Sequence, residues 1–490
     1  MLKKMIRQVL PAKVFLAFLG GIVAGTVLSV ALSMNFFTSV YWVIFAGISL
    51  IFSIIKPNYL TVSLALIAGI TLGSFRVSSE LSSKAVFEQL VGKNVVLSGE
   101  VQGDPDFDGS SSNLRLKVSE AEFSGTIFVS GFIDSRVERG DRIEISGKLS
   151  EGFGSFSGAI YRGEITRLEK PMPGSLLLKF RNGFAEQVRK NLGEENSREA
   201  SLGLAYLLGM RNGLDEETLE ILRLVGLTHI VVASGTHLGI IVEFFRKSFG
   251  KVSRFAGLFF SLIFILLFGE LVGWTASIMR AALVSGLTLL AGYSGRKLGA
   301  GRVILFAMAT TLLVNPMFLV DLGWLLSFGS FIGIMILNPR LTRFFYGEKK
   351  PEKIAEIILT TISATLMCAP ILLFFFGSLS LISIVANLLI LPTIPYAMLG
   401  TLLTGAIGFI PGVGFLTNLL LKYHLFVMEF FSKQTSFLVQ IPSGKTEVFL
   451  AYIVILLPFI FGDFIRASIK RKKRIKFEKN FAKNIRLTIT

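Results

Sequence analysis

Long apolar runs dominate the pattern of hydrophobic and polar positions along this chain. The first run, at about 14–33, is followed by two more at 41–55 and 59–75. Because about 20 apolar residues span the hydrocarbon core of a bilayer, these runs predict about three transmembrane helices within residues 1–80. Basic residues before the first run favour a cytoplasmic N-terminus. A cleavable signal peptide is disfavoured, because further spans follow at once.

The pattern changes between residues 81 and 170, where apolar and polar positions alternate. Short segments of period 2, separated by turns rich in Gly and Asp, predict about five strands and a small antiparallel barrel. Residues 85–169 hold nine basic and fourteen acidic residues. This acidic balance favours an extracytoplasmic barrel. Arg139-Gly140-Asp141 looks like an adhesion tripeptide, but the pattern more simply predicts the tight turn before a strand at 142–148.

Apolar runs resume after the barrel. Residues 171–226 have helical spacing with basic residues on one side, which predicts amphipathic helices at the membrane edge. Residues 227–465 form a polytopic region with a basic loop after every second run. Between 378 and 436, prolines and glycines predict broken or re-entrant helices and leave the number of spans open. The basic tail at 466–490 is expected to remain in the cytoplasm.

Composition agrees with the pattern. The chain is 52% hydrophobic and 17% charged, with a mean hydropathy of +0.66. These values exclude a soluble enzyme, a disordered protein and a coiled coil. The net charge of +17 is first an orientation signal, since basic loops stay in the cytoplasm. Cys368 is the single cysteine, so an intrachain disulfide is excluded, and three scattered histidines do not predict a zinc site.

Polar side chains interrupt the apolar run at 228–242, THIVVASGTHLGIIV. Ser234 and His237 share one face of a helix, and Gly235 and Gly239 form an i,i+4 pair that permits close backbone approach. One interpretation is a tightly packed helix pair, and the other is the lining of a pore or site. An intramembrane protease of rhomboid type is disfavoured. A nucleophile and its base on one helix are poorly placed around a substrate bond.

Other apolar runs also contain polar residues. Arg280 lies well inside its run, where a charge costs ~2.5–3.5 kcal/mol on insertion scales and by default marks a function. Structural pairing with Asp321 or Glu270 is the alternative. Asp321 lies in another apolar run, where a carboxylate is also costly. Asn387 lies between broken helical pieces, where capping of backbone groups is the simpler role.

Together these segments resemble the ComEC family of competence proteins. LAYLLGMRNGLDEETLEILRLVGLTHIVVASGTHLGIIV is similar to the family signature, in which Gly-x-x-His leads into Ser-Gly-x-His-x-Gly. Weaker matches are MRAALVSG, LGWLLSFGS and FGSLSLISIVANLLILP, and the likeness covers roughly residues 1–465. It implies an α-helical polytopic membrane protein with an inserted OB-like barrel. The signature positions are Gly226, His229, Ser234, Gly235, His237 and Gly239.

The resemblance implies a channel subunit, not an enzyme, that passes single-stranded DNA across the cytoplasmic membrane during natural transformation. Such a channel needs a wet path, because a charged strand cannot enter hydrocarbon. No metal or other cofactor is expected. The residues expected to line the path are His229, Ser234, Gly235, His237, Gly239, Arg280, Asp321 and Asn387.

Two departures from the family qualify this expectation. Many members continue into a metallo-β-lactamase-like domain, but its His-x-His-x-Asp-His motif is lacking here, so we expect a short form without nuclease activity. The barrel's net charge of −5 is unfavourable for capturing phosphates, although bases can stack on aromatic rings beside local cations. The residues expected to bind DNA in this way are Arg115, Lys117, Phe123, Phe128 and Phe132, with Phe156 and Tyr161 as further stacking candidates.

Partners follow from the same reasoning. The sequence has no Gly-x-x-x-x-Gly-Lys-Ser/Thr loop, so a cytoplasmic ATP-driven helicase is expected to pull the strand. A DNA receptor outside, a separate nuclease and membrane lipid are further expected partners, and a homo-oligomer stays open. Two alternatives remain for the function: a small-solute or lipid transporter with an exterior barrel, and an intramembrane hydrolase.

Overall fold

The fold is that of a computed structural model of the 490-residue chain, which divides into two compact units. One unit comprises residues 1–328 and 385–435, and the other comprises residues 329–384 and 436–490. The structure describes residues 11–32, 39–108, 111–119, 124–131, 137–169, 176–211, 213–231, 235–347, 349–380, 382–410, 412–434, 438–440, 447–448 and 450–455.

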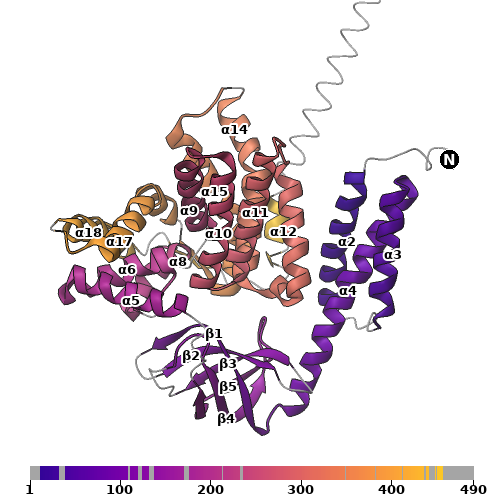
Figure 1. The fold of residues 1–490 in the computed structure, drawn as a ribbon, viewed down its shortest axis with the longest axis horizontal. Helices are drawn as coiled ribbons and strands as arrows, with labels where there is room; N and C mark the ends of the chain where they lie inside the picture. Colours follow the sequence, from indigo (N-terminus) through magenta and orange to yellow (C-terminus); the bar gives the residue numbers. More distant parts are fainter. Residues whose placement is uncertain are drawn as a thin grey trace, which may run out of the picture. The chain divides into compact units, whose positions relative to one another are not determined.

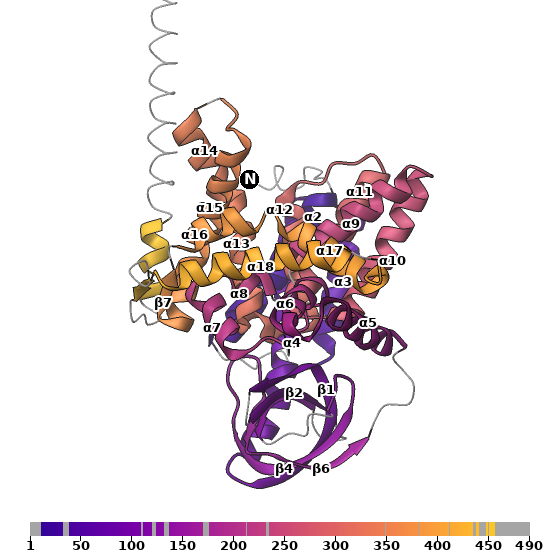
Figure 2. The same ribbon diagram turned by 90° about the vertical axis from the view of Figure 1, so that its left-hand side faces the viewer.

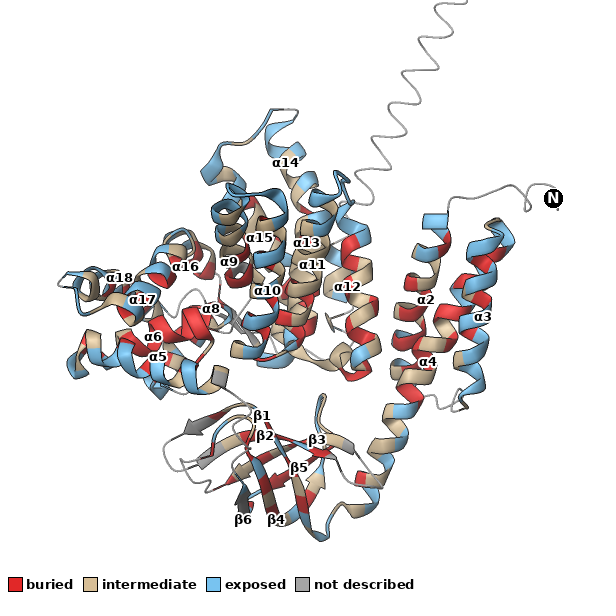
Figure 3. Ribbon diagram, viewed as in Figure 1, coloured by how far each residue is buried: buried red, intermediate tan, exposed pale blue. Residues whose placement is uncertain are grey.

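Three helices precede the barrel: α2 (Pro11–Leu32), α3 (Tyr41–Ile55) and α4 (Tyr59–Leu90) (Figure 1). Glycines let α2 and α4 approach closely. Gly21 and Gly25 lie against the backbone of α4, and Gly69 and Gly73 lie against the backbone of α2. A side chain at any of these positions would collide with backbone, so the contact depends on small residues. Figure 3 shows buried positions on both helices.

The last turns of α4 belong to the barrel. The helix extends ten residues beyond the boundary expected at residue 80. Phe87 is fully buried among the residues of the barrel core, and Leu90 packs against the same core. The difference arises because polar residues after position 76 end the membrane-like pattern while the helix itself continues.

Six strands follow: β1 (Asn94–Asp108), β2 (Ser111–Ser119), β3 (Ser124–Gly131), β4 (Arg142–Glu151), β5 (Gly158–Tyr161) and β6 (Glu164–Glu169). The first five close into a barrel in the order β1-β2-β3-β5-β4-β1, and β6 pairs with β4. Strands β3 and β5 run parallel. This closed five-stranded barrel confirms the predicted small all-β insert and has the strand order of an OB-like domain.

The long strand β1 closes the barrel by pairing with both β2 and β4. Its register shifts between Gln102 and Asp106, and Gly103 there has φ +78°, a conformation that suits glycine. Alternate residues point inward to an apolar core, as period 2 predicts. That core consists of Phe87, Leu97, Val101, Leu114, Leu116, Val118, Ile127, Val129, Val137, Ile143, Ile145, Leu149 and Ile160.

The polytopic part of the first unit begins with short helices and continues with longer ones. They are α5 (Leu176–Leu192), α6 (Ser197–Leu208), α7 (Glu216–Leu224), α8 (Thr228–Val231), α9 (Gly235–Gly250), α10 (Arg254–Val272), α11 (Ala276–Tyr293) and α12 (Ala300–Val314). A 3₁₀ turn, η2 (Pro316–Val320), leads into α13 (Leu322–Ile336). Helices α9, α10 and α11 share one apolar core around Leu238, Phe268 and Ile278.

Two later helices, α17 (Ile394–Ile407) and α18 (Val413–Ser432), pack on α5 and α6 (Figure 2). Gly203 of α6 lies against Thr401, and Gly400 of α17 lies against Thr417, so threonines fill these close contacts. Residues 200–208 of α6 are all buried. The sequence predicts an amphipathic helix at the membrane edge, whereas in the structure this segment is enclosed on all sides by protein.

A broken helix precedes α18, as the prolines and glycines of this region predict. α16 (Ser383–Ile390) and α17 meet at an angle of 51° across residues 391–393. Thr393 donates its hydroxyl to the Ile390 carbonyl at 2.8 Å, so it accepts from His424 Nε2, 2.7 Å away. The buried His424 of α18 thereby holds the break.

The second unit contains the end of α13, α14 (Asn338–Tyr346), α15 (Lys353–Phe376) and the paired strands β7 (Ser378–Ser380) and β8 (Leu438–Gln440). Gly333 lies against the Ser363 carbonyl of α15. Asn338 donates to Thr360 Oγ1 at 3.2 Å, which ties the start of α14 to α15. The last predicted span and the basic tail lie mostly or wholly outside the described residues.

Six helices in the described part of the chain are long and apolar enough to cross a membrane, or up to seven if the bent pair is one span. The predicted class of a polytopic helical membrane protein is therefore confirmed. Two of the predicted spans form shorter helices, α3 and α12, with 15 residues each. The apolar run at 228–242 contains α8 and the first half of α9, and residues 232–234 lie outside the described residues.

Candidate functional site

One wall of the barrel carries exposed cations beside exposed rings. Arg115 and Lys117 point outward from β2, and both are exposed. Across the ladder, Arg115 faces Phe128 of β3 and Lys117 faces Thr126. The alternation of β2 and β3 places their apolar neighbours in the core and these residues on the surface.

Four aromatic rings gather on this wall; we call them the aromatic patch. Phe128 of β3 lies 5.3 Å from Phe153, 5.6 Å from Phe156 and 6.3 Å from Tyr161 between ring centroids. Phe153 and Phe156 come from the loop between β4 and β5, and Tyr161 ends β5. Phe153 is 47% exposed and Tyr161 is 53% exposed. Such exposure leaves ring surface accessible to a planar ligand.

The position of the patch within the barrel is informative. In OB-type barrels, strands 2 and 3 and the loops after strands 1 and 4 form the face that binds oligonucleotides. Here the same face holds the patch, with Arg115 Cζ 5.7 Å from the centroid of Phe156. Base stacking on rings beside a cation is how single strands are held without sequence readout. Of the predicted residues, Phe123 and Phe132 lie outside the described residues.

Phe153 was not among the residues predicted from the sequence. The signal was present, because Gly152-Phe153-Gly154 marks the β4–β5 turn and an aromatic residue at a turn tip has few packing partners. Gly154 indeed has φ +56°.

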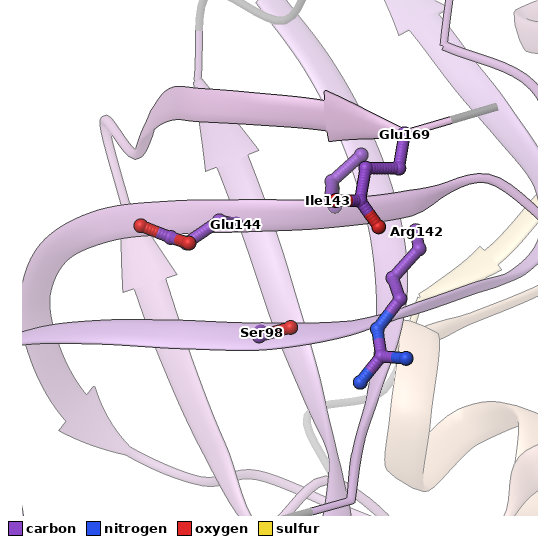
Figure 4. Close-up of a pocket in the computed structure, with 5 residues that line it drawn as sticks. All are labelled: Ser98, Arg142, Ile143, Glu144 and Glu169. Atoms are coloured by element: carbon purple, nitrogen blue, oxygen red, sulfur yellow. The ribbon is translucent and has the colours of Figure 1, made fainter.

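Some of the acidic residues of the barrel lie away from the aromatic patch, in a separate pocket. A pocket of about 200 Å³ lies between β1, β4 and β6 and is lined by Ser98, Arg142, Ile143, Glu144 and Glu169 (Figure 4). Arg142 and Glu169 face each other across the β4–β6 ladder. With two carboxylates and one guanidinium, this pocket is unsuited to phosphate, whereas the face of β2 and β3 carries two cations.

A second polar group lies among the helices α9, α11 and α13. Arg280 of α11 is buried, with 8% exposure, and its Cζ lies 5.9 Å from the ring centroid of Phe328. A Cβ at Gly235, the first residue of α9, would lie 2.8 Å from Arg280 Nη2. The guanidinium therefore lies directly against the first turn of α9. The structure thus brings together two positions that are 45 residues apart in the sequence.

Further hydrogen-bonding groups lie close by. Ser277 is one turn before Arg280 on α11, and its hydroxyl lies 3.4 Å from that of Ser327 on α13. His237 follows Gly235 on α9 and is 1% exposed. Ser277 and Ser327 were not predicted, although Ser327 lies in the motif LGWLLSFGS and Ser277 lies two residues before MRAALVSG. We call Gly235, His237, Ser277, Arg280 and Ser327 the helical polar group.

The other predicted channel residues are placed differently. Ser234 lies outside the described residues, and His229 is exposed on α8. Nothing lies within 4 Å of a Cβ built at Gly239, so the predicted glycine notch is not a close contact there. Asp321 caps α13, accepting from the Trp324 N–H at 2.9 Å. This capping explains the carboxylate in an apolar run, because the run is interrupted by η2.

Asn387 lies on α16, one turn before the break that precedes α17. Asn387 is 6% exposed, and its backbone carbonyl accepts from the Leu391 N–H at 2.9 Å. Among the described residues, no group of three or more His, Cys, Asp or Glu is arranged to hold a metal ion.

Comparison with known proteins now decides the family. Residues 206–469, more than half of the chain, match the family model described as Competence protein. This chain belongs to the ComEC family of competence proteins. Membership of this family supports a role in transformation. The helical polar group lies inside the matched segment, whereas the barrel precedes it.

Two relatives accompany this match. ComE operon protein 3 of Bacillus subtilis (strain 168) is 26% identical over 205 residues, which cover 41% of this chain and 26% of that protein. An uncharacterized protein of Aquifex aeolicus (strain VF5) is 24% identical over 338 residues, covering 68% of this chain and 77% of that protein. The alignment thus spans about a quarter of the first relative's length. No solved structure matches the chain.

Proposed function

We propose that this ComEC-family chain is the channel subunit that passes single-stranded DNA across the cytoplasmic membrane during natural transformation. The observation that carries the proposal is the aromatic patch, which has Arg115 beside it on the oligonucleotide-binding face of an OB-like barrel. An aromatic ring stacks on the flat face of a base, and this face is accessible in a single strand but covered by neighbouring base pairs in a duplex. The patch therefore favours single-stranded DNA over duplex DNA as the ligand.

The helical polar group suits the second part of the task. A phosphate that crosses hydrocarbon needs wall groups that replace its hydration without trapping it. One guanidinium and two serine hydroxyls supply such donors, the first charged and the others neutral. A single arginine attracts each passing phosphate, whereas a row of arginines would retain the polymer.

The remaining roles belong to partners in this proposal. A receptor outside delivers DNA, a separate nuclease removes one strand, and a cytoplasmic ATP-driven helicase pulls the other. In this arrangement the barrel faces outward and both termini lie in the cytoplasm. The chain acts alone or as a homo-oligomer, and bilayer lipid surrounds the six long apolar helices found in the described residues.

An import assay with labelled DNA tests the proposal. Cells that lack the native protein receive Arg280→Gln, Arg280→Lys, a Phe128→Ala/Phe153→Ala double variant, or Val96→Ala as control. Val96 is an exposed apolar residue of β1, with 58% exposure. We expect Arg280→Gln and the double variant to leave DNA outside the cytosol, Arg280→Lys to import partly, and Val96→Ala to import normally.

A DNA-binding assay with the purified proteins separates capture of the strand by the barrel from its passage through the helices. The purified Arg280→Gln protein should bind a fluorescent oligothymidylate as the native protein does, because the barrel is unchanged, whereas the double variant should bind weakly. Immunoblots of membranes confirm equal amounts of each variant. Normal import by both Arg280→Gln and the double variant would overturn the proposal.

A further inference from the structure

A buried ion pair joins the barrel to the helices that follow it. Arg181 of α5 is 4% exposed. Its guanidinium donates two hydrogen bonds to the carboxylate of Asp104 on β1, from Nη2 to Oδ1 at 2.6 Å and from Nη1 to Oδ2 at 3.0 Å. Two parallel hydrogen bonds of this kind fix both distance and orientation. Arg181 belongs to the basic side that the helical spacing predicts for α5, and the structure buries this side chain against the barrel.

The same guanidinium reaches a third element. Arg181 Nη1 donates to the Leu271 carbonyl at 3.1 Å, and Arg139 Nη1 of the barrel donates to that carbonyl at 3.3 Å. Leu271 lies in the last turn of α10, where carbonyls lack helical partners and the helix dipole is negative. The end of α10 therefore accepts one cation from the barrel and one from α5.

The charges depend on one another. Burial lowers the pKa of Arg139, the Asp104 carboxylate opposes that effect, and the neighbouring Arg181 adds to it. Arg181 is buried and Arg139 is partly buried, and because both guanidinium groups donate to one carbonyl, their positive charges repel each other. Asp104 is the carboxylate that pairs with Arg181, so its removal leaves the buried Arg181 without its paired anion.

The local backbone places Asp104 for this contact. Asp104 lies within the register shift of β1, next to Gly103 at φ +78°. At a bulge a residue leaves the ladder and its side chain is redirected. A neighbouring contact supports the arrangement, since Asn182 donates to Glu138 Oε1 at 3.3 Å beside the turn that holds Arg139.

We propose that Arg181, with Asp104, is a positioning residue that holds the barrel on the end of α10, so that a strand bound by the aromatic patch enters the helical part in a fixed orientation. The role in import rests on the proposed function. The attachment of the barrel to the end of α10 does not rest on the proposed function, because it follows from the contacts of Arg181, Asp104, Arg139 and Leu271.

Distances between two spin labels show directly whether the barrel keeps a fixed position at the end of α10. Labels are placed at Lys148 of the barrel and Lys251 of the α9–α10 turn, both exposed, in a Cys368→Ser background of the full chain in nanodiscs. We expect one narrow distance distribution for the native pair and a broad one for Arg181→Gln. Asp104→Asn keeps Arg181 and removes the anion, and it should also broaden the distribution.

Arg246→Gln is the matched control. Its guanidinium also lies 2.6 Å from a carboxylate, that of Glu243, but the pair is exposed on α9. An exposed pair contributes little, so this variant should keep the narrow distribution. A narrow distribution in both Arg181→Gln and Asp104→Asn would overturn the proposed hold.

Import and binding complete the test. We expect Arg181→Gln to bind oligothymidylate normally and to lose import. Normal import by a variant with a broad distribution would overturn the positioning role. If the Phe128→Ala/Phe153→Ala protein bound oligothymidylate as the native protein does, the proposed function would fail while the spin-label result still decided the hold.

Discussion

The guanidinium of Arg115 lies over the ring of Phe156, with Cζ 5.7 Å from the ring centroid. This contact joins β2 to the loop between β4 and β5. Because Phe156 also packs against Phe128 and Phe153, the cation and three rings form one continuous surface. A base stacked on a ring and its phosphate near the cation would therefore meet groups that are already in place.

The most exposed ring of the loop should matter for binding. Replacing Phe153 by alanine removes a stacking surface, and each stacked base contributes ~1–3 kcal/mol. We expect the dissociation constant for oligothymidylate to rise about 5- to 150-fold, measured by fluorescence anisotropy. Val96→Ala should leave it unchanged. An unaltered affinity in Phe153→Ala would exclude the ring from the binding surface.

Salt dependence should reveal the phosphate contact of Arg115. For single strands, the slope of log K against log salt changes by about 0.7 for each phosphate contact. Arg115→Gln should therefore flatten the slope by about that amount and weaken binding at low salt most. Arg142→Gln serves as control, since Arg142 lines the acidic pocket and faces Glu169. Equal slopes for native and Arg115→Gln proteins would contradict a phosphate contact at this residue.

Two glycines on α9 should respond differently to the same change. A Cβ at Gly235 would meet Arg280 Nη2 at 2.8 Å, whereas a Cβ at Gly239 has nothing within 4 Å. Alanine raises helix propensity at both sites by ~1 kcal/mol. We therefore expect Gly235→Ala to displace the guanidinium and reduce import, and Gly239→Ala to import normally. Equal import by the two variants would argue against a role for the contact between Arg280 and Gly235.

A similar pair tests the packing of α2. Gly21 lies against the backbone of Leu66 and Gly69, whereas Gly20 has open space around it. We expect Gly21→Ala to lower the thermal midpoint of the detergent-solubilised protein, because overpacking costs ~1–3 kcal/mol and the neighbouring backbone must shift. Gly20→Ala should leave the midpoint unchanged or raise it. An unshifted midpoint in Gly21→Ala would show that α2 and α4 separate easily.

The barrel was the most predictable part of the fold. Alternation at Leu114, Leu116 and Val118 has period 2, and the structure buries all three. The pattern is local, so the sequence suffices to find it. The strand order is not local: pairing of β3 with β5 in parallel depends on closure of the whole barrel, which no single segment encodes.

The site divides in the same way. Arg115 and Phe128 were predicted because a surface strand shows its exposed residues by alternation. The contact of Arg181 could not be predicted, because its partner Asp104 is 77 residues away and helical spacing does not reveal what a basic face contacts. Asp321 looked like an intramembrane charge. Its capping role became visible only with the 3₁₀ turn that ends at Val320.

Phe87 has a practical consequence for anyone who isolates the barrel. Its ring is fully buried in the core of the barrel, although Phe87 belongs to the end of α4. A soluble fragment that starts at the first strand would leave a hole the size of a phenylalanine ring, and losses of ~3–5 kcal/mol accompany such truncations. A fragment that starts near residue 80 would keep the Phe87 side chain in the core, and we expect this fragment to fold. The helix α4, which is long and apolar enough to cross a membrane, thus also completes the hydrophobic core of the barrel.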